Sequence, residues 1–162
     1  MDECDNVLET DKDPQQVSRA KYRKAELLQN TLDFQPAVEI YEQLLKGDQP
    51  LMKEKALMRL AECCYRLEKI DQGLAYLEQL EKEIRPRTIY TICLLKGKFQ
   101  DLIKRFDVAA TFYEEALVLY SKEFANQIDL NVLGNIQFRL GWSLIRSRKD
   151  IDGGIKNLVG AN

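Results

Sequence analysis

The chain has 162 residues, of which 45% are hydrophobic and 31% are charged, and its formal net charge is −2 at neutral pH. This balance is typical of a helix-rich protein folded as one domain, and it gives no overall electrostatic attraction to nucleic acid or to anionic membranes. The sequence has no histidine, the side chain best suited to proton transfer near neutral pH and the commonest metal ligand.

The chain begins with an acidic segment that is followed by a helical pattern. Residues 1–15 are rich in aspartate and glutamate and are predicted to form an acidic, disordered tail. From there on, apolar residues recur at intervals of three and four, as in Ala25, Leu28 and Leu32, which indicates helices. The expected helices lie near 16–31, 34–46, 51–67, 70–83, 87–102, 105–124, 129–147 and 150–159. The strict alternation typical of strands is missing, so the sequence predicts an all-α fold.

A repeat of 36 residues relates successive pairs of these helices, which is the mark of stacked repeats. Two repeat positions hold small residues, which let paired helices approach closely: Ala25, Ala61 and Gly97 at one, and Ala37, Gly73 and Ala109 at the other. Pro50 and Pro86 share a third position, where proline ends one helix and precedes the next. A fourth pair, with Gly141 and Gly154, follows after 44 to 45 residues. Its extra residues are expected to lengthen the helices around residues 123–133 by about two turns.

This pattern resembles the tetratricopeptide repeat (TPR) family. In that family one small residue lies in the middle of the first helix of each pair (helix A), and another lies early in the second (helix B), with an aromatic residue four positions later, as Tyr41 and Tyr113 are here. The resemblance implies an α-solenoid of about eight helices in a right-handed superhelix. It covers residues 16–162, with repeats near 18–50, 51–86, 87–124 and 129–162. The tryptophan that is usual in helix A is replaced by Lys21, Leu57, Cys93 and Gln137.

The resemblance also implies that the A helices line a concave groove that binds a helix or extended peptide of a partner protein. The candidate contacts in that groove are Tyr22, Glu26, Met58, Glu62, Tyr65, Leu94, Lys98, Phe138, Trp142 and Ile145. Met58, Leu94 and Phe138 fit the core equally well if the register is shifted by one residue. Trp142, the single tryptophan, fits helix packing as well as a binding hot spot.

Two narrower resemblances bear on the partner. One subclass of the family grips the acidic C-termini of heat-shock chaperones with lysine, asparagine and arginine, but the matching places here hold Tyr22, Glu26, Arg59, Thr91 and Leu95, so chaperone binding is not expected. Residues 137–158 resemble the first repeat of the mitochondrial fission adaptor family. Shared repeat architecture accounts for that second similarity better than membership of the family.

Nothing in the sequence assembles a catalytic site. Phosphate-binding and nucleophile motifs are missing, and no cofactor is expected. Four cysteines, Cys4, Cys63, Cys64 and Cys93, lack the spacing of a zinc site, so no metal is expected, and we interpret them as reduced thiols that pack as small hydrophobic side chains. The sequence has neither a signal peptide nor a run of 18 apolar residues, which favours a cytoplasmic location without a membrane span.

The sequence therefore predicts a non-catalytic adaptor or scaffold that binds a partner helix or peptide in its groove. The alternative is a structural subunit of a larger helical assembly. Residues 158–162 offer little cover for Trp142, Leu144 and Ile145, and a repeat array needs a polar cap at its end. A partner, a second copy or the rest of a longer chain would cover that edge.

Overall fold

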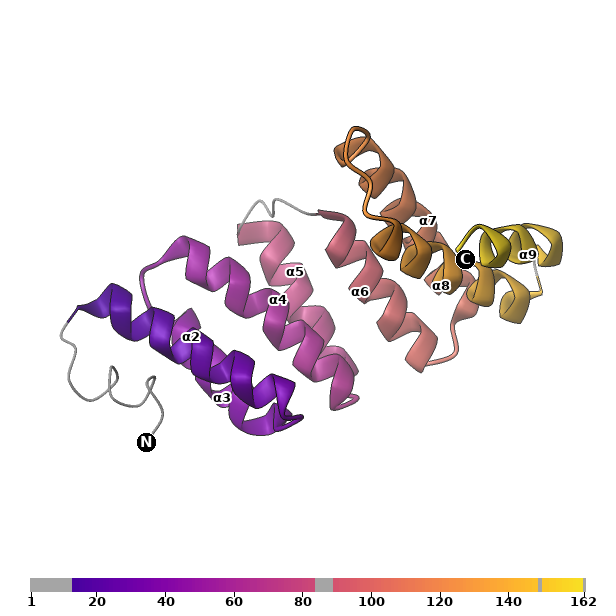
Figure 1. The fold of residues 1–162 in the computed structure, drawn as a ribbon. Helices are drawn as coiled ribbons and strands as arrows, with labels where there is room; N and C mark the ends of the chain where they lie inside the picture. Colours follow the sequence, from indigo (N-terminus) through magenta and orange to yellow (C-terminus); the bar gives the residue numbers. More distant parts are fainter. Residues whose placement is uncertain (1–12, 84–88, 149, 162) are drawn as a thin grey trace. The chain divides into compact units, whose positions relative to one another are not determined.

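A computed structural model describes residues 13–83, 89–148 and 150–161, and these residues fold into eight helices without a strand (Figure 1). The helices are α2 (Pro14–Asn30), α3 (Phe34–Leu45), α4 (Pro50–Arg66), α5 (Ile70–Glu83), α6 (Ile89–Leu102), α7 (Phe106–Glu123), α8 (Leu130–Ser147) and α9 (Ile151–Gly160). Every boundary lies within two residues of its predicted position. The all-α fold is confirmed, while most of the predicted acidic tail lies outside the described residues.

The helix starts follow from capping side chains. The Asp13 carboxylate accepts a hydrogen bond from the Gln15 amide at 2.9 Å, so α2 begins at Pro14, inside the segment predicted to be disordered. Asp129 caps α8 through the Asn131 amide in the same way. Pro50 is the first residue of α4 and therefore starts that helix, where its missing amide hydrogen costs little, rather than ending the one before. Pro86 lies outside the described residues.

Each A helix is followed within two residues by a residue with a positive φ angle. These residues are Leu32 (67°), Glu68 (56°), Lys104 (59°) and Arg148 (57°), and they are spaced by 36, 36 and 44 residues. After α6, for example, the Lys104 amide donates to the Asp101 carbonyl at 3.0 Å and the Arg105 amide donates to the Gln100 carbonyl at 2.9 Å. Such returning bonds close a helix C-terminus. The backbone thus repeats with the period that the sequence predicts.

The described helices fall into two compact units, and the first contains α2 to α5. In this unit α2 packs against α3, α3 against α4 and α4 against α5. The buried cluster at its centre consists of Ala25, Ala37, Val38, Tyr41, Leu44, Ala56, Leu60 and Cys63. Two of the small residues of the repeat, Ala25 and Ala37, are buried in this cluster, in agreement with the close approach of helices that they predict.

The second unit contains α6 to α9, and its helices meet at glycines. A Cβ atom built on Gly97 would lie 2.5 Å from a ring carbon of Tyr113, and one built on Gly141 would lie 2.6 Å from the Gly154 carbonyl oxygen. A side chain at either place would force the paired helices apart. Both glycines therefore belong to the packing that the sequence predicts.

The extra residues of the last repeat lengthen one helix only. Helix α7 has 18 residues where α3 has 12, whereas α8 has 18 residues and α4 has 17. The connection at 124–129 is also slightly longer than the one at 46–49. The expectation that helices on both sides of this connection would lengthen is wrong. The Tyr120 hydroxyl holds the longer connection, because it accepts from the Asp129 amide at 2.9 Å.

Candidate functional site

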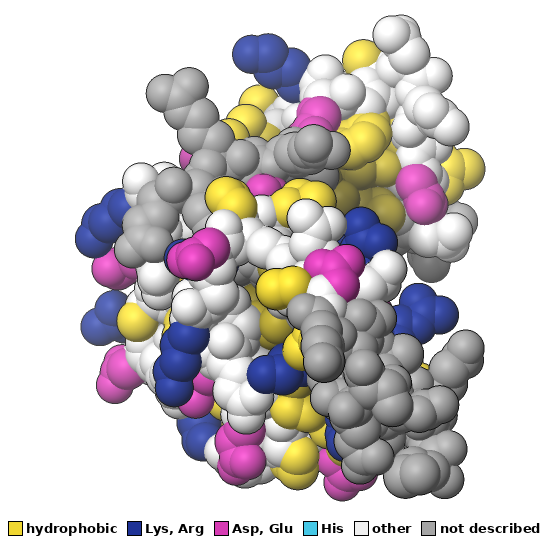
Figure 2. Space-filling view, turned by 90° about the vertical axis from the view of Figure 1, so that its left-hand side faces the viewer, with side chains coloured by type: hydrophobic (Ala, Val, Ile, Leu, Met, Phe, Trp, Pro, Cys, Tyr) yellow, Lys and Arg dark blue, Asp and Glu magenta, His cyan; other side chains and the backbone are white. Residues whose placement is uncertain are grey.

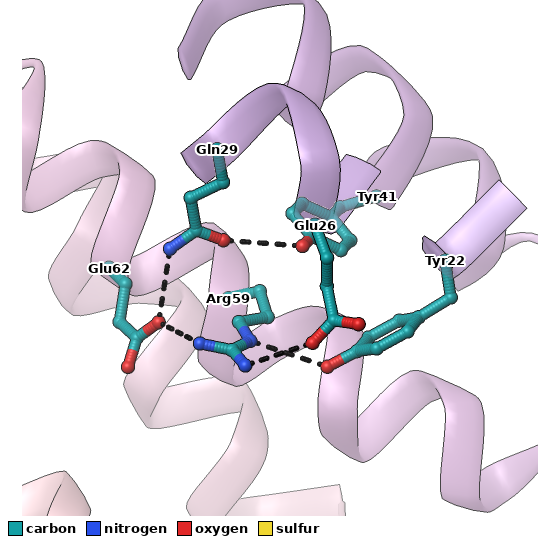
Figure 3. A network of polar contacts seen from close by, with 6 residues as sticks. All are labelled: Tyr22, Glu26, Gln29, Tyr41, Arg59 and Glu62. Atoms are coloured by element: carbon teal, nitrogen blue, oxygen red, sulfur yellow. Dashed lines mark hydrogen bonds and ion pairs between the residues drawn. The ribbon is translucent and has the colours of Figure 1, made fainter. Parts of the chain in front are cut away.

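Polar contacts between the first two A helices, α2 and α4, centre on Arg59 (Figure 3). The Arg59 guanidinium donates to the Glu26 carboxylate at 3.0 Å, to the Glu62 carboxylate at 2.9 Å and to the Tyr22 hydroxyl at 3.3 Å. Three residues predicted to line the groove are thus brought together by a fourth that was not among the candidate contacts. The spacing of Arg59 three residues before Glu62 is the one sequence signal that could have indicated part of this arrangement.

The network extends inward from these charges. The Gln29 amide donates to Glu62 at 3.2 Å and accepts from the buried Tyr41 hydroxyl at 3.2 Å. Burial lowers the pKa of Arg59, but hydrogen bonds with Tyr22 and Glu62 outweigh burial, and the pKa is raised overall. The guanidinium therefore keeps its charge, and it is paired with two carboxylates.

A concavity of about 280 Å³ opens beside this network. It is lined by Arg23, Glu26, Leu27, Gln29, Asn30 and Arg59. Its wall is mostly polar, with the Leu27 side chain as its large apolar part. Met58 and Tyr65, the other candidate contacts of the first unit, are half-buried. On the face shown in Figure 2, basic, acidic and hydrophobic side chains are mixed among the described residues.

In the second unit, large apolar side chains on α8 are exposed. Phe138 is 54% exposed and Trp142, one turn later, is 47% exposed. Phe138 and Leu130 line a concavity of about 620 Å³ together with Asn131, Gly134, Asn135, Arg139 and Ala161. Exposed large aromatic side chains on one side of a helix are unusual for a purely solvated surface.

The remaining candidates of the second unit have different surroundings. Leu94 packs against two buried clusters, so its side chain belongs to the core rather than to an open surface. Ile145 is half-buried and lies against Gly154, and Lys98 is half-buried. The Arg146 guanidinium lies over the rings of Phe106, at 4.4 Å, and Trp142, at 5.8 Å, which is the geometry of a cation–π interaction. This contact holds the exposed Trp142 ring in place.

A cluster of three rings beside another concavity is packed too tightly to hold a ligand between its members. The centroid of Tyr90 lies 4.9 Å from that of Tyr120 and 5.8 Å from that of Phe124, and Tyr120 and Phe124 are 5.0 Å apart. At these distances the rings contact one another, and no ammonium group fits between them. The cluster therefore stabilises the end of α7.

The thiols have the properties of core side chains. Cys63, Cys64 and Cys93 are buried. Burial, together with the charge of Glu62, raises the pKa of Cys63 to about 12, and burial raises the pKa of Cys64 to about 11. Both are protonated at neutral pH and are poor nucleophiles. Among the residues that the structure describes, no three cysteine, aspartate or glutamate side chains are grouped to hold a metal ion.

These thiols should make stability depend on pH under alkaline conditions. A thiol in the unfolded chain ionises near its ordinary pKa of 9.0, whereas in the folded chain Cys64 ionises only near 11 and Cys63 near 12. The folded state thus binds more protons, and stability falls between pH 9 and 11 by up to about 1.4 kcal/mol per pH unit for each thiol. We expect urea unfolding of the Cys63→Ala, Cys64→Ala double variant to show a smaller slope of free energy against pH. Equal slopes would contradict this account.

Comparison with other proteins adds evidence on the fold. No protein-family model and no curated protein sequence matches the chain. Among the described residues, no helix is both long and apolar enough to cross a bilayer. Nothing in the comparisons supports the resemblance of residues 137–158 to the mitochondrial fission adaptors.

Two solved structures match nearly the whole chain. A structure of a MamA RS-1 ArsTM double mutant matches with a TM-score of 0.71 at 14% identity, over 98% of this chain and 79% of that one. BtubC (BKLC) from P. vanneervenii matches with a TM-score of 0.52 at 17% identity, over 98% of this chain and 84% of that one. Identities this low show a shared fold alone. The chain has the all-α solenoid fold of TPR-like proteins.

Proposed function

We propose that this chain is a non-catalytic adaptor that binds a helix or extended peptide of a partner protein. The observation that carries the proposal is the exposure of Phe138 and Trp142, one turn apart on α8. Large aromatic side chains supply much of the binding energy at protein interfaces, and a folded protein gains nothing by leaving two of them in water.

The concavity beside Phe138 suits a peptide. Leu130 and Phe138 offer apolar walls, while Asn131, Asn135 and Arg139 offer hydrogen-bond donors at its edge. An apolar anchor of the partner would be buried between the first two, and carbonyl groups of the partner would accept from the others. Buried thiols fit a reducing compartment such as the cytoplasm.

The Arg59 network of the first unit offers a partner less affinity than the aromatic pair of the second unit. Its three ion-pairing side chains are about one-third exposed, and pairs of this kind are each worth at most about 1 kcal/mol. A charged partner would have to replace bonds that Arg59 already makes to Glu26 and Glu62. We therefore expect the variant Arg59→Met to weaken partner binding less than removal of the two aromatic side chains.

The test uses partners captured by a photo-reactive amino acid at position 135, beside Phe138, and then purified. The double variant Phe138→Ala, Trp142→Ala should lose about 2 kcal/mol or more of binding free energy. This loss corresponds to a dissociation constant roughly 30-fold higher. The matched control is Val118→Ala on α7, because Val118 is 67% exposed and lies outside the concavity. If the double variant folds and binds as tightly as this control, the aromatic pair is not the binding surface.

The second candidate function is a structural subunit of a larger helical assembly. It is favoured by a second set of exposed apolar residues, on α9. With the α9 face as the contact, this function predicts that the chain enters its assembly equally well with or without the Phe138 and Trp142 side chains. The same double variant therefore separates the two candidates.

A further inference from the structure

A concavity of about 500 Å³ lies within the second unit, where the C-terminal end of α7 is joined to the N-terminal end of α8. It is the concavity beside the three-ring cluster. Its lining residues are Tyr90, Tyr120, Phe124, Gln127, Ile128, Asp129 and Val132. They come from α6, from the end of α7, from the connection after it and from the start of α8, so three helices shape it.

The extra residues of the last repeat build most of this concavity. Helix α7 has 18 residues where α3 has 12, and Tyr120 lies in the added turns. Phe124, Gln127 and Ile128 lie in the connection at 124–129, which is longer than the one at 46–49. Insertions in repeat proteins fall in loops on one face, which is often the binding face. The concavity is therefore an addition to the plain repeat.

Hydrogen bonds hold the Asp129 carboxylate in place at the edge of this concavity. The buried Tyr120 hydroxyl accepts from the Asp129 amide at 2.9 Å and donates to the Asp129 carbonyl at 3.2 Å. The carboxylate oxygen Oδ1 accepts from the Asn131 amide at 2.9 Å. The other oxygen, Oδ2, makes no hydrogen bond to a described residue, and a carboxylate accepts on both oxygens. A ligand would thus meet an acceptor that is fixed before binding, which lowers the entropy lost on binding.

The remaining walls are largely apolar and partly open to solvent. Tyr90, Phe124 and Val132 are half-buried. Ile128 is 44% exposed. Among the described residues that line the concavity, no lysine or arginine balances Asp129. A purely apolar side chain of a partner would take water from the carboxylate without replacing its hydrogen bonds, which is costly. The occupant that suits these walls therefore combines an apolar stem with a cation.

We propose that this concavity binds an arginine side chain of a partner protein. The methylene stem would pack on Ile128 and Val132, and the guanidinium would donate to Oδ2 of Asp129. The rings of Tyr90 and Phe124 would lie beside the guanidinium, which is attracted to aromatic rings. Arginine suits the site better than lysine because its planar head group stacks on rings and carries several donors in a fixed geometry. The guanidinium lies beside the ring cluster and not between its members.

This inference goes beyond the proposed adaptor function and does not depend on it, since neither Phe138 nor Trp142 lines this concavity. Asp129 lines this concavity and Leu130 lines the one beside Phe138, so one partner could reach both. The double variant Phe138→Ala, Trp142→Ala should bind an arginine probe as the unaltered chain does. Either binding site can therefore fail in experiment while the other stands.

The probe for the test is N-acetyl-arginine amide, and its matched control is the citrulline counterpart, which has a similar shape without the charge. A ligand of this size reaches a dissociation constant on the order of 1 mM, so binding is followed by NMR in the backbone amide signals of the labelled chain. We expect the signals of Gln127, Ile128 and Asp129 to move, and citrulline to bind roughly fivefold more weakly than arginine. Equal binding of the two probes would overturn the inference. So would signals that stay unmoved by arginine at about ten times this constant.

The variant Asp129→Asn tests the carboxylate without removing the helix cap, because asparagine caps a helix about as well as aspartate. We expect its thermal unfolding to match that of the unaltered chain and its affinity for the arginine probe to be roughly fivefold lower. The matched control is Asp13→Asn, at another capping aspartate that lies outside the concavity, and it should leave the affinity unchanged. If Asp129→Asn binds arginine as tightly as this control, the carboxylate does not bind the cation and the inference is wrong.

Discussion

The variant Gly141→Val is expected to lower the free energy of unfolding by about 3 kcal/mol. A Cβ atom on Gly141 would lie 2.6 Å from the Gly154 carbonyl oxygen and 3.0 Å from the Leu158 amide nitrogen. Both are backbone atoms of α9, so no change of side-chain conformation relieves the clash and the whole helix must shift. The loss of contact between α8 and α9 exceeds the gain in helix propensity that valine brings over glycine, which is at most about 0.5 kcal/mol.

The matched control for this variant is Gly47→Ala. A Cβ atom on Gly47 would meet only the Leu44 carbonyl oxygen at 3.4 Å, and Gly47 has no positive φ angle. This replacement should leave stability unchanged or raise it by a few tenths of a kcal/mol, to about 1 kcal/mol at most. Urea unfolding followed by circular dichroism measures both changes. Equal stability of the two variants would show that α8 and α9 do not meet at Gly141.

The variant Asp101→Ala is expected to destabilise the second unit by about 3 kcal/mol. The Asp101 carboxylate accepts from the Tyr113 hydroxyl at 2.7 Å and from the Ser143 hydroxyl at 2.9 Å, and so it joins α6, α7 and α8. Both donors are on fully buried residues. Without the carboxylate each would lose its acceptor in the interior, at about 1–3 kcal/mol for each group.

Two further variants test whether the cost of Asp101→Ala comes from the two buried donors. In a background with Tyr113→Phe and Ser143→Ala the same Asp101→Ala change should cost about 1 kcal/mol or less, because the donors are gone. The first unit offers a natural counterpart, since the Tyr41 hydroxyl donates to Gln29 at 3.2 Å with the same spacing of 12 residues. Gln29→Ala removes two longer bonds, only one of which has a buried donor, and should cost less than Asp101→Ala. Chemical unfolding of each variant at neutral pH measures these costs, and a full-sized effect in the donor-free background would refute the account.

The sequence predicted those features of the fold that depend on short-range periodicity, namely the helices and their repeat. Helix boundaries depend on apolar spacing and on capping residues such as Asp13 and Pro50, which act within one turn. The repeat was visible because small residues recur wherever two helices touch. The side-chain network around Arg59 was not predictable, because Glu26 and Arg59 are 33 residues apart and their pairing depends on how two helices are set against each other.

The candidate contacts show a related limit. Leu94 and Phe138 share one repeat position, yet Leu94 packs on buried clusters while Phe138 is exposed. Register gives the side of a helix on which a residue lies, but exposure depends on which neighbouring helices cover that side. The sequence could therefore name surfaces only as candidates.

The order of helix contacts has a consequence for how the chain folds. Within each unit, the described helices pack mainly against the helix that comes next in the sequence. Such contacts close only short loops, so the entropy lost before the first stabilising contact forms is small and folding should be rapid. The core of α2 to α5 uses residues of the first unit alone, and it can assemble during synthesis before the second unit has left the ribosome.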